Sequence, residues 1–298
     1  MSTISQAMKT GPGADAVSEA ARERMVGAIL IDAGKLRPED AEKILRAQKE
    51  KGLRFGEAGV RLGLLKQADI DFALSRQFGY SYLQPGERGV AQELVAAYQP
   101  FSHAVEELRA LRSQLMLRWF TGEPGHKALA VVGTERGEGR SYVAANLAVV
   151  FSQLDERTLL IDADLRNPRQ HSLFRLENRT GLSAWLSGRA GSEAIQAVPG
   201  LPGLSVLTAG AVPPNPQELL GRAQFPALLE QICADHDVVL LDTPAMDTAA
   251  DAQMVGARAR AALLVARKDH SRLPVLQALS AALSDSGAAV VGAVMNAF

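Results

Sequence analysis

The sequence predicts an α/β fold: a doubly wound, mainly parallel β-sheet preceded by a small helical domain. Six short apolar runs alternate with helical stretches after residue 101, and a glycine-rich turn follows the first run. A glycine-spaced repeat stands ahead of them. The runs are near-continuously apolar, as in strands covered by helices on both faces. They span 128–132, 158–162, 204–209, 238–242, 261–266 and 289–295.

Composition narrows the class of protein. The chain has 298 residues, of which 47% are apolar and 22% charged, as in a globular protein with one large and one smaller domain. A net charge of −1 gives no reason to expect a nucleic-acid partner. Cys233 is the only cysteine, so an intrachain disulfide is impossible. The lack of a ~20-residue apolar run or a signal peptide predicts a cytoplasmic protein.

The order of these features predicts four regions. Residues 1–20 have no hydrophobic period and are expected to form a disordered arm. Residues 21–83 carry the repeat and are expected to form the small helical domain. Residues 84–100, with Pro and Gly, are interpreted as a linker, and residues 101–298 form the α/β domain.

Two copies make up the internal repeat. The glycines Gly27 and Gly34 are seven residues apart, as are Gly56 and Gly63. Each copy is interpreted as a helix ended by a glycine, a turn and a second helix with aliphatic residues at helical spacing.

The repeat resembles the N-terminal domain of type II secretion and pilus-assembly ATPases. One variety of that domain, the MshEN-like one, binds cyclic di-GMP through an Arg-Leu-Gly opening. The second copy here has Arg54-Phe55-Gly56, whereas the first has Met25-Val26-Gly27 and lacks the arginine. Two interpretations stay open: a cyclic di-GMP site and a plain docking module.

The glycine-rich turn after the run 128–132 predicts a phosphate-binding loop and hence a P-loop NTPase. Such loops have the form Gly-x-x-x-x-Gly-Lys-Ser/Thr, in which backbone N–H groups surround the phosphates and the hydroxyl binds Mg²⁺. Arg140 occupies the lysine position and Thr134 that of the first glycine. The residues predicted to bind nucleotide are Glu135, Arg136, Gly137, Glu138, Gly139, Arg140, Ser141 and Tyr142.

Acidic residues close two of the apolar runs. The run 158–162 ends in Asp162, followed by Asp164, and the run 238–242 ends in Asp242. Carboxyl ends of parallel strands form the ligand-binding edge of such sheets. Alternation would put Asp162 and Asp164 on one side, where a metal-water network and an attacking hydroxyl could share them. Alternatively, these two acids cap a strand-to-turn junction. Asp242 is predicted to act on Mg²⁺ opposite Ser141.

The three motifs, in this order, resemble the Walker A, A′ and B set of the bacterial tyrosine kinases (BY-kinases), which are related to the deviant-Walker ATPases. The segment Glu106-Glu-Leu-Arg109-Ala-Leu-Arg112 is similar to the oligomerisation helix of that family. Asn296 stands where relatives contact adenine. Together with the repeat domain, the chain resembles the EpsG-type kinases that determine exopolysaccharide chain length.

The resemblance implies an ATP- and Mg²⁺-dependent tyrosine autokinase. Asp162 and Asp164 would organise metal and act as base, while Arg140 would stabilise phosphate charge and Ser141, Asp162 and Asp242 would serve the metal. The implied partners are a membrane-anchored polysaccharide co-polymerase, which would hold this cytoplasmic chain at the inner membrane, and further copies of the chain. Arg166, with Arg169, Arg175 and His171 nearby, is interpreted either as part of a solvated basic face or as a bridge to a neighbouring subunit.

Arg140 leaves a second function open. A guanidinium is a planar fork, whereas lysine is a compact point charge, so nucleotide binding is expected to tolerate the change better than the rate of phosphoryl transfer. All four tyrosines, Tyr80, Tyr82, Tyr98 and Tyr142, lie upstream of the last two apolar runs. The alternative is a non-phosphorylating nucleotide-gated scaffold, or a weak ATPase of the partition type, with an N-terminal module that docks a partner or senses cyclic di-GMP.

Overall fold

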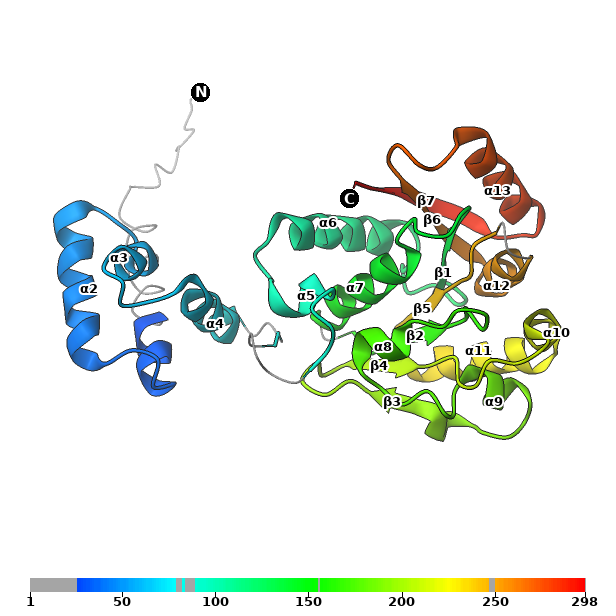
Figure 1. The fold of residues 1–298 in the computed structure, drawn as a ribbon, viewed down its shortest axis with the longest axis horizontal. Coiled ribbons are helices and arrows are strands. Elements are labelled where there is room, and N and C mark those ends of the chain that lie inside the picture. The colour runs from blue at the N-terminus through cyan, green and yellow to red at the C-terminus, as the bar shows by residue number, and fades with distance from the viewer. Residues whose placement is uncertain (1–25, 79–81, 84–88, 155, 247–249, 298) are drawn as a thin grey trace, which may run out of the picture. The chain divides into compact units, whose positions relative to one another are not determined.

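The structure, a computed structural model, describes residues 26–78, 82–83, 89–154, 156–246 and 250–297 (Figure 1). The chain divides into two compact units. The N-terminal unit comprises residues 1–80 and the C-terminal unit residues 81–298.

Helices build the described part of the N-terminal unit. Residues 26–32 are helical, and they are followed by α2 (Pro38–Lys51), α3 (Phe55–Arg61) and α4 (Gln67–Phe78). Leu30, Ile44 and Phe55 are buried in their shared core. Helix α2 begins with Pro38, whose missing N–H costs nothing at that position.

The repeat glycines have two different physical roles. Gly34 and Gly63 end the first helix of each copy with φ values of 68° and 67°, which glycine adopts without strain. Gly56 instead lies at a close contact, because a Cβ there would come within 2.9 Å of the Cδ1 atom of Ile70. The helix-turn-helix interpretation of both copies is confirmed over the described residues.

One seven-stranded sheet forms the centre of the C-terminal unit, in the order β3-β4-β2-β5-β1-β6-β7. Neighbours pair in parallel except β3 and β4. The predicted mainly parallel sheet is confirmed. The strands are β1 (Ala128–Gly133), β2 (Thr158–Asp162), β3 (Ile195–Ala197), β4 (Leu204–Leu207), β5 (Val238–Asp242), β6 (Ala261–Arg267) and β7 (Ala289–Asn296).

The strands differ in detail from the sequence-based expectation. β2 and β5 have the predicted bounds, whereas β4 ends before the predicted residue 209. β3 was not predicted, because its three residues carry no apolar run and its side chains are only partly covered. It adds an antiparallel edge to a sheet that is otherwise parallel.

Helices cover both faces of the sheet (Figure 1). Alternate residues of β1 enter two cores: Leu129 and Val131 one, Ala130 and Val132 the other. The first core is covered by α5 (Val95–Tyr98), α6 (His103–Arg118), α7 (Arg140–Ser152) and α8 (Gln170–Phe174). The second is covered by α9 (Leu182–Leu186), α10 (Pro216–Gly221), α11 (Gln224–Asp235), α12 (Asp251–Ala259) and α13 (Leu273–Asp285), while the short 3-10 helix η1 (Ser192–Ala194) precedes β3.

The predicted linker over 84–100 is not an open linker in its described part. Leu94, Ala96 and Ala97 are buried, and the Ala96 N–H donates to Asn146 Oδ1 at 3.0 Å. The Gln153 amide donates to the Ala96 carbonyl at 3.1 Å. The described part of this segment, which includes the short helix α5, therefore packs along α7.

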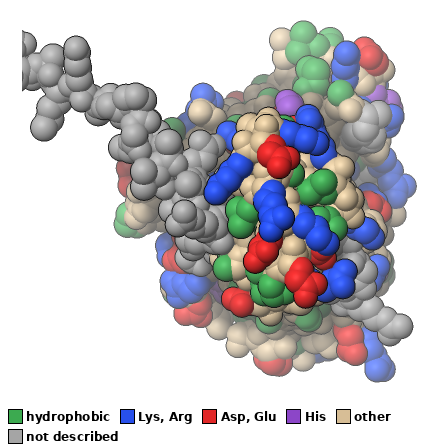
Figure 2. All heavy atoms as spheres, turned by 90° about the vertical axis from the view of Figure 1, so that its left-hand side faces the viewer, with side chains coloured by type: hydrophobic (Ala, Val, Ile, Leu, Met, Phe, Trp, Pro, Cys, Tyr) green, Lys and Arg blue, Asp and Glu red, His purple; other side chains and the backbone are tan. Residues whose placement is uncertain are grey.

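Charged side chains of both signs share the face of the molecule in Figure 2. On α2, Asp40 accepts from Arg37 and Lys43, and Arg46 lies 3.9 Å from Glu42. The Arg46–Glu42 pair is exposed on both sides and contributes little to stability, whereas Asp40 is buried. In the ranges that the structure describes, every helix falls short of the length or apolar content needed to cross a bilayer.

Candidate functional site

The glycine-rich loop joins the carboxyl end of β1 to the first turn of α7. Gly137 and Gly139 have φ values of 84° and 94°, which explains why glycine is required there. Gly139 is the residue ahead of α7, so the loop leads directly into a helix N-terminus. Free N–H groups and the helix dipole make this end of α7 suited to an anion such as a phosphate group.

Glu138 is turned away from solvent, behind the loop. Its side chain is fully buried and accepts hydrogen bonds from the Thr134 hydroxyl at 2.6 Å and the Glu135 N–H at 3.0 Å. The Ser271 hydroxyl, from the segment between β6 and α13, donates to it at 2.5 Å. Glu138 therefore shapes the loop from within. The sequence predicted its place in the loop but not the contribution of Ser271.

Arg140 also points into the protein. Its Nη1 donates to the Glu135 carbonyl at 2.6 Å and lies 3.4 Å from Glu138 Oε2, while its Nε donates to the Thr243 carbonyl at 3.2 Å. Only 9% of the side chain is exposed. The guanidinium thus fastens the loop to the end of β5 and to the buried carboxylate. Its predicted contact with phosphate stays a prediction.

Two carboxylates face each other across adjacent strands. β2 pairs in parallel with β5, and Asp162 is in register with Asp242. Both side chains are fully buried. Burial raises the pKa of Asp162 well above its usual range, and the charge of Asp242 raises it further. Burial also raises the pKa of Asp242, to about 6, against hydrogen bonds from Gln170 and Ser141.

The sequence interpretation missed Gln170, which lies between these acids. Its Nε2 donates to Asp242 Oδ2 at 2.7 Å and to the Ser141 carbonyl at 3.2 Å. Its backbone N–H donates to Asp162 Oδ2 at 2.9 Å. The only signal in the sequence was its place shortly after the second motif, which does not distinguish it from its neighbours.

Asp164 caps the turn that follows β2. Its Oδ1 accepts from the backbone N–H groups of Arg166 at 3.1 Å and Asn167 at 2.9 Å. Asp162 likewise accepts from backbone N–H groups, those of Arg169 and Gln170. Both acids therefore make the backbone hydrogen bonds expected if they cap the strand-to-turn junction after β2. Asp162 differs because it also faces Asp242.

Comparison with known proteins identifies the family. A family model described as "Cellulose biosynthesis protein BcsQ" matches residues 126–285, all within the C-terminal unit. Tyrosine-protein kinase YwqD of Bacillus subtilis (strain 168) is 35% identical over 205 residues, which cover 69% of this chain and 86% of YwqD. This chain belongs to the bacterial tyrosine kinase family.

A second curated relative and two solved structures are also similar to this chain. Tyrosine-protein kinase Etk of Escherichia coli (strain K12) is 36% identical over 202 residues, which are 68% of this chain and 28% of Etk. The solved kinase domain of E. coli Etk is similar at 33% identity and a TM-score of 0.66, over 74% of this chain and 92% of that domain. The chimerical protein CapA2B2 is similar at 30% identity and a TM-score of 0.64, over 75% of this chain and 96% of that one. These similarities confirm the predicted P-loop fold.

The oxygen atoms at this site of the kinase fold suit Mg²⁺. Asp162 and Asp242 each keep one buried oxygen, Oδ1, without a partner, and the Ser141 hydroxyl adjoins Asp242. Among the described residues no three His, Cys, Asp or Glu side chains group as metal ligands. Mg²⁺ is usually held by one or two carboxylates together with substrate phosphates and water, so this sparse set fits it.

Asn296, predicted to contact adenine in this kinase fold, is the last residue of β7. Its Nδ2 donates to the Glu138 carbonyl at 2.8 Å. The Asn296 side chain therefore stabilises the loop through the Glu138 carbonyl, while the Glu138 side chain bonds to Thr134 and Glu135. Tyr142, in the first turn of α7, packs partly against the first core, and burial raises its pKa. The adenine role of Asn296 remains a prediction.

Arg166 was interpreted from the sequence as part of a solvated face or as a bridge to a neighbouring subunit. In the structure its Nε lies 2.8 Å from Asp251 Oδ2 in the same chain, and Asp251 is almost fully buried. Helix α12 thus places a buried carboxylate beside Arg166 within the chain, and the part of Arg166 in an intersubunit contact remains a prediction. The pair was not predicted from the sequence, because its members are 85 residues apart.

The predicted oligomerisation residues of the kinase family lie on α6. Glu106 is exposed and pairs with Arg109 at 3.3 Å, while only 15% of the Arg109 side chain is exposed. Arg112 donates to the Val150 carbonyl near the end of α7 at 2.6 Å. Both arginines thus also serve packing within the chain, and their part in oligomer formation remains a prediction.

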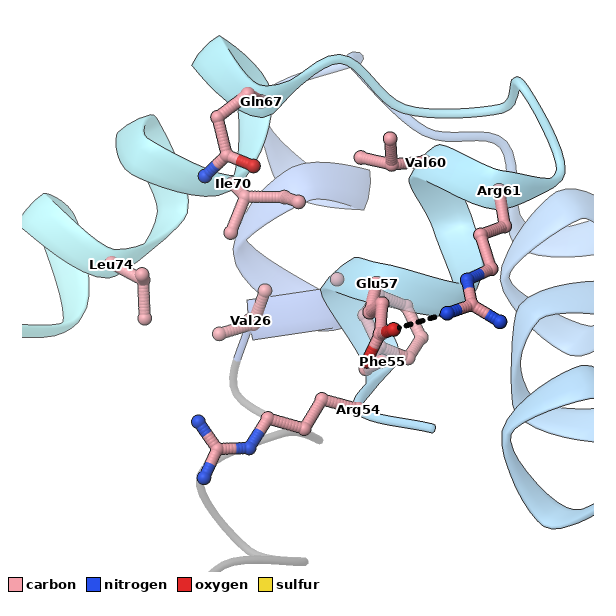
Figure 3. A pocket seen from close by; sticks show the side chains of 10 residues that line it. Val26, Arg54, Phe55, Glu57, Val60, Arg61, Gln67, Ile70 and Leu74 are labelled. Carbon is pink, nitrogen blue, oxygen red and sulfur yellow. Dashed lines mark hydrogen bonds and ion pairs between the residues drawn. The ribbon is translucent and has the colours of Figure 1, made fainter. Parts of the chain in front are cut away.

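The N-terminal unit contains a cavity of about 540 Å³ between its helices (Figure 3). Its wall is mainly apolar, with polar groups from α3 and α4. Glu57 and Arg61 pair with each other at 2.9 Å on one side, and Arg54 extends from the start of α3. The lining residues are Val26, Arg54, Phe55, Gly56, Glu57, Val60, Arg61, Gln67, Ile70 and Leu74.

Proposed function

We propose that this chain is an ATP-dependent protein tyrosine autokinase that regulates exopolysaccharide chain length and export with a membrane-anchored co-polymerase. The observation that supports it best is the meeting of Ser141, Asp162 and Asp242 at one edge of the sheet, beside a loop that leads into a helix N-terminus. Membership of the tyrosine kinase family supports the choice of reaction.

The residues of the site have separate roles in phosphoryl transfer. The loop N–H groups and Arg140 bind phosphate charge, while Asp162 and Asp164 organise the metal and accept the proton of a tyrosine hydroxyl. Ser141, Asp162 and Asp242 would hold Mg²⁺, which would supply charge neutralisation when bound. Positioning and charge neutralisation account for most of the catalysis in this reaction class.

The assembly is part of the same proposal. Copies of the chain associate through Glu106, Arg109 and Arg112 of α6, and the co-polymerase holds this cytoplasmic protein at the inner membrane. The exposed side chain of Glu106 supports such a contact, because it is accessible to a neighbouring chain.

The kinase proposal predicts label on tyrosine when the chain is incubated with Mg²⁺ and γ-labelled ATP, alone or with the cytoplasmic tail of its co-polymerase. The double variant Asp162→Ala, Asp164→Ala is expected to lose at least about a hundredfold in rate, as when a main charge-stabilising group is removed. Asp285→Ala, an exposed acid at the end of α13, serves as control. Equal labelling of the double variant would contradict these roles.

A nucleotide-gated scaffold without phosphoryl transfer is the second candidate. The observation that favours it is the inward position of Arg140, which bonds to Glu135, Glu138 and Thr243. A guanidinium occupied in this way stabilises the loop without reaching the γ-phosphate. In the same experiment, ATP binding with no label on any tyrosine would support the scaffold over the kinase.

We also propose that the cavity of the N-terminal unit binds cyclic di-GMP. Its apolar wall suits the faces of two guanine bases, and Arg54 would pair with a phosphate group. Arg54 is the candidate for the anion because it stands in the second copy at the place of the arginine in the Arg-Leu-Gly opening. A plain docking module is the alternative.

Calorimetric titration of the full chain tests the cavity. Arg54→Ala is expected to weaken cyclic di-GMP binding at least tenfold, since a hydrogen bond to a charged group contributes about 1.5–3 kcal/mol. The control is Arg46→Ala, which removes the same charge from an exposed side chain on α2. No heat with the wild-type chain, or equal affinity in the Arg54 variant, would leave only docking.

A further inference from the structure

Three buried oxygen atoms without hydrogen-bond partners gather at the carboxyl edge of the sheet. They are Asp162 Oδ1, Asp242 Oδ1 and Gln170 Oε1. Buried polar atoms almost always have partners, so a group of orphaned acceptors points to a ligand that supplies the missing positive charge or donors. The two aspartates belong to the predicted motifs. Gln170 is the member of this group to which no role has been given.

The contacts of Gln170 connect all three motifs. Its side-chain amide bonds to Asp242 of the third motif and to the Ser141 carbonyl of the first. Its backbone N–H bonds to Asp162 of the second. Asp242 Oδ2 and Asp162 Oδ2 are both occupied by this residue, and each carboxylate therefore has its Oδ1 left over. Gln170 is itself fully buried, so these contacts are not exchanged with solvent.

The chemistry of the site requires an amide at this position. A carboxamide offers N–H donors to Asp242 and to the carbonyl of Ser141, and keeps an oxygen acceptor on the same group. A glutamate would add a third acid next to two that already repel each other. A leucine of similar size would remove the donors and leave Asp242 Oδ2 without this partner.

We propose that Gln170 is a positioning residue for Mg²⁺-nucleotide. It fixes Asp242 relative to the first turn of α7, so that Asp242 Oδ1 and the Ser141 hydroxyl can bind the same cation. Its own Oε1 accepts a hydrogen bond from water on that cation. Mutation of residues that hydrogen-bond to the ligands of a metal typically changes the affinity for the metal 10- to 100-fold. The inference rests on nucleotide and Mg²⁺ use but not on phosphoryl transfer.

The test measures binding of a fluorescent ADP analogue by the full chain at increasing Mg²⁺ concentration. Gln170→Leu is expected to reduce the enhancement of nucleotide affinity by Mg²⁺ about tenfold. Gln170→Asn, which keeps the amide but shortens its reach, is expected to give a smaller reduction. The Gln170→Asn variant also provides a second measurement of the effect of Mg²⁺ if the leucine variant folds poorly.

The matched control is Gln153→Leu, a glutamine at the opposite end of α7 whose amide also bonds to a backbone carbonyl. It is expected to keep the wild-type enhancement by Mg²⁺. Equal loss of affinity with and without Mg²⁺ in both Gln170 variants would overturn the inference, as would titrations that superimpose on the wild type. Failure of tyrosine labelling would leave this binding experiment intact.

Discussion

Replacing Asp242 with asparagine is expected to stabilise the metal-free chain at pH 7.5 and to abolish Mg²⁺-dependent nucleotide binding. The pKa of Asp242 is raised from 3.8 to about 6. The folded chain therefore holds this proton more tightly than the unfolded chain, and stability falls as the pH rises from about 4 to 6. This rise in the pKa of Asp242 corresponds to a loss of about 3 kcal/mol in the free energy of unfolding, which the neutral asparagine would restore.

Urea unfolding at pH 4 and pH 7.5 measures this effect. The gain in the free energy of unfolding from Asp242→Asn should be near zero at pH 4, where the native carboxyl is already protonated, and close to 3 kcal/mol at pH 7.5. Asp237→Asn is the control of opposite sign, because a hydrogen bond from Arg157 lowers the pKa of Asp237. A loss of stability at pH 7.5 in Asp242→Asn would show that its carboxylate is stabilised in the fold.

Replacing Glu138 with alanine is expected to destabilise the chain by about 3–5 kcal/mol, because it leaves the buried Arg140 guanidinium without its counter-charge. The Thr134 and Ser271 hydroxyls and the Glu135 N–H would lose their acceptor as well. Nucleotide affinity should fall with stability, because the same carboxylate holds the shape of the loop. Urea unfolding and ADP binding measure the two effects.

Glu135→Ala provides the matched control. This glutamate belongs to the same loop and pairs with His270 and Arg272 near the surface, so its removal should change stability by at most about 1 kcal/mol. The double variant Glu138→Ala, Arg140→Ala tests the pairing itself, since removal of both charges should be less harmful than the sum of the single changes. Strict additivity would mean that the two side chains do not depend on each other.

Sequence alone determined the sheet and the placement of its motifs. Apolar runs that end at Asp162 and Asp242 predicted β2 and β5, because a strand buried on both faces must be apolar along its length. The loop at Gly137 and Gly139 was equally evident, since a turn with positive φ restricts the choice of residue. Both signals are local and need no knowledge of what packs against them.

Only the tertiary structure decided the partners of these motifs. Ser271 bonds to Glu138, 133 positions away, and Asn296 reaches the carbonyl of the same residue from the end of β7. Gln170 joins two strands and a helix. Such pairs depend on strand order and side-chain direction, which are set by packing of the whole unit. The sequence therefore determined the glycine-rich loop and the acids of the site, whereas the fold decided that Arg140 turns inward and that Gln170 and Ser271 contact these groups.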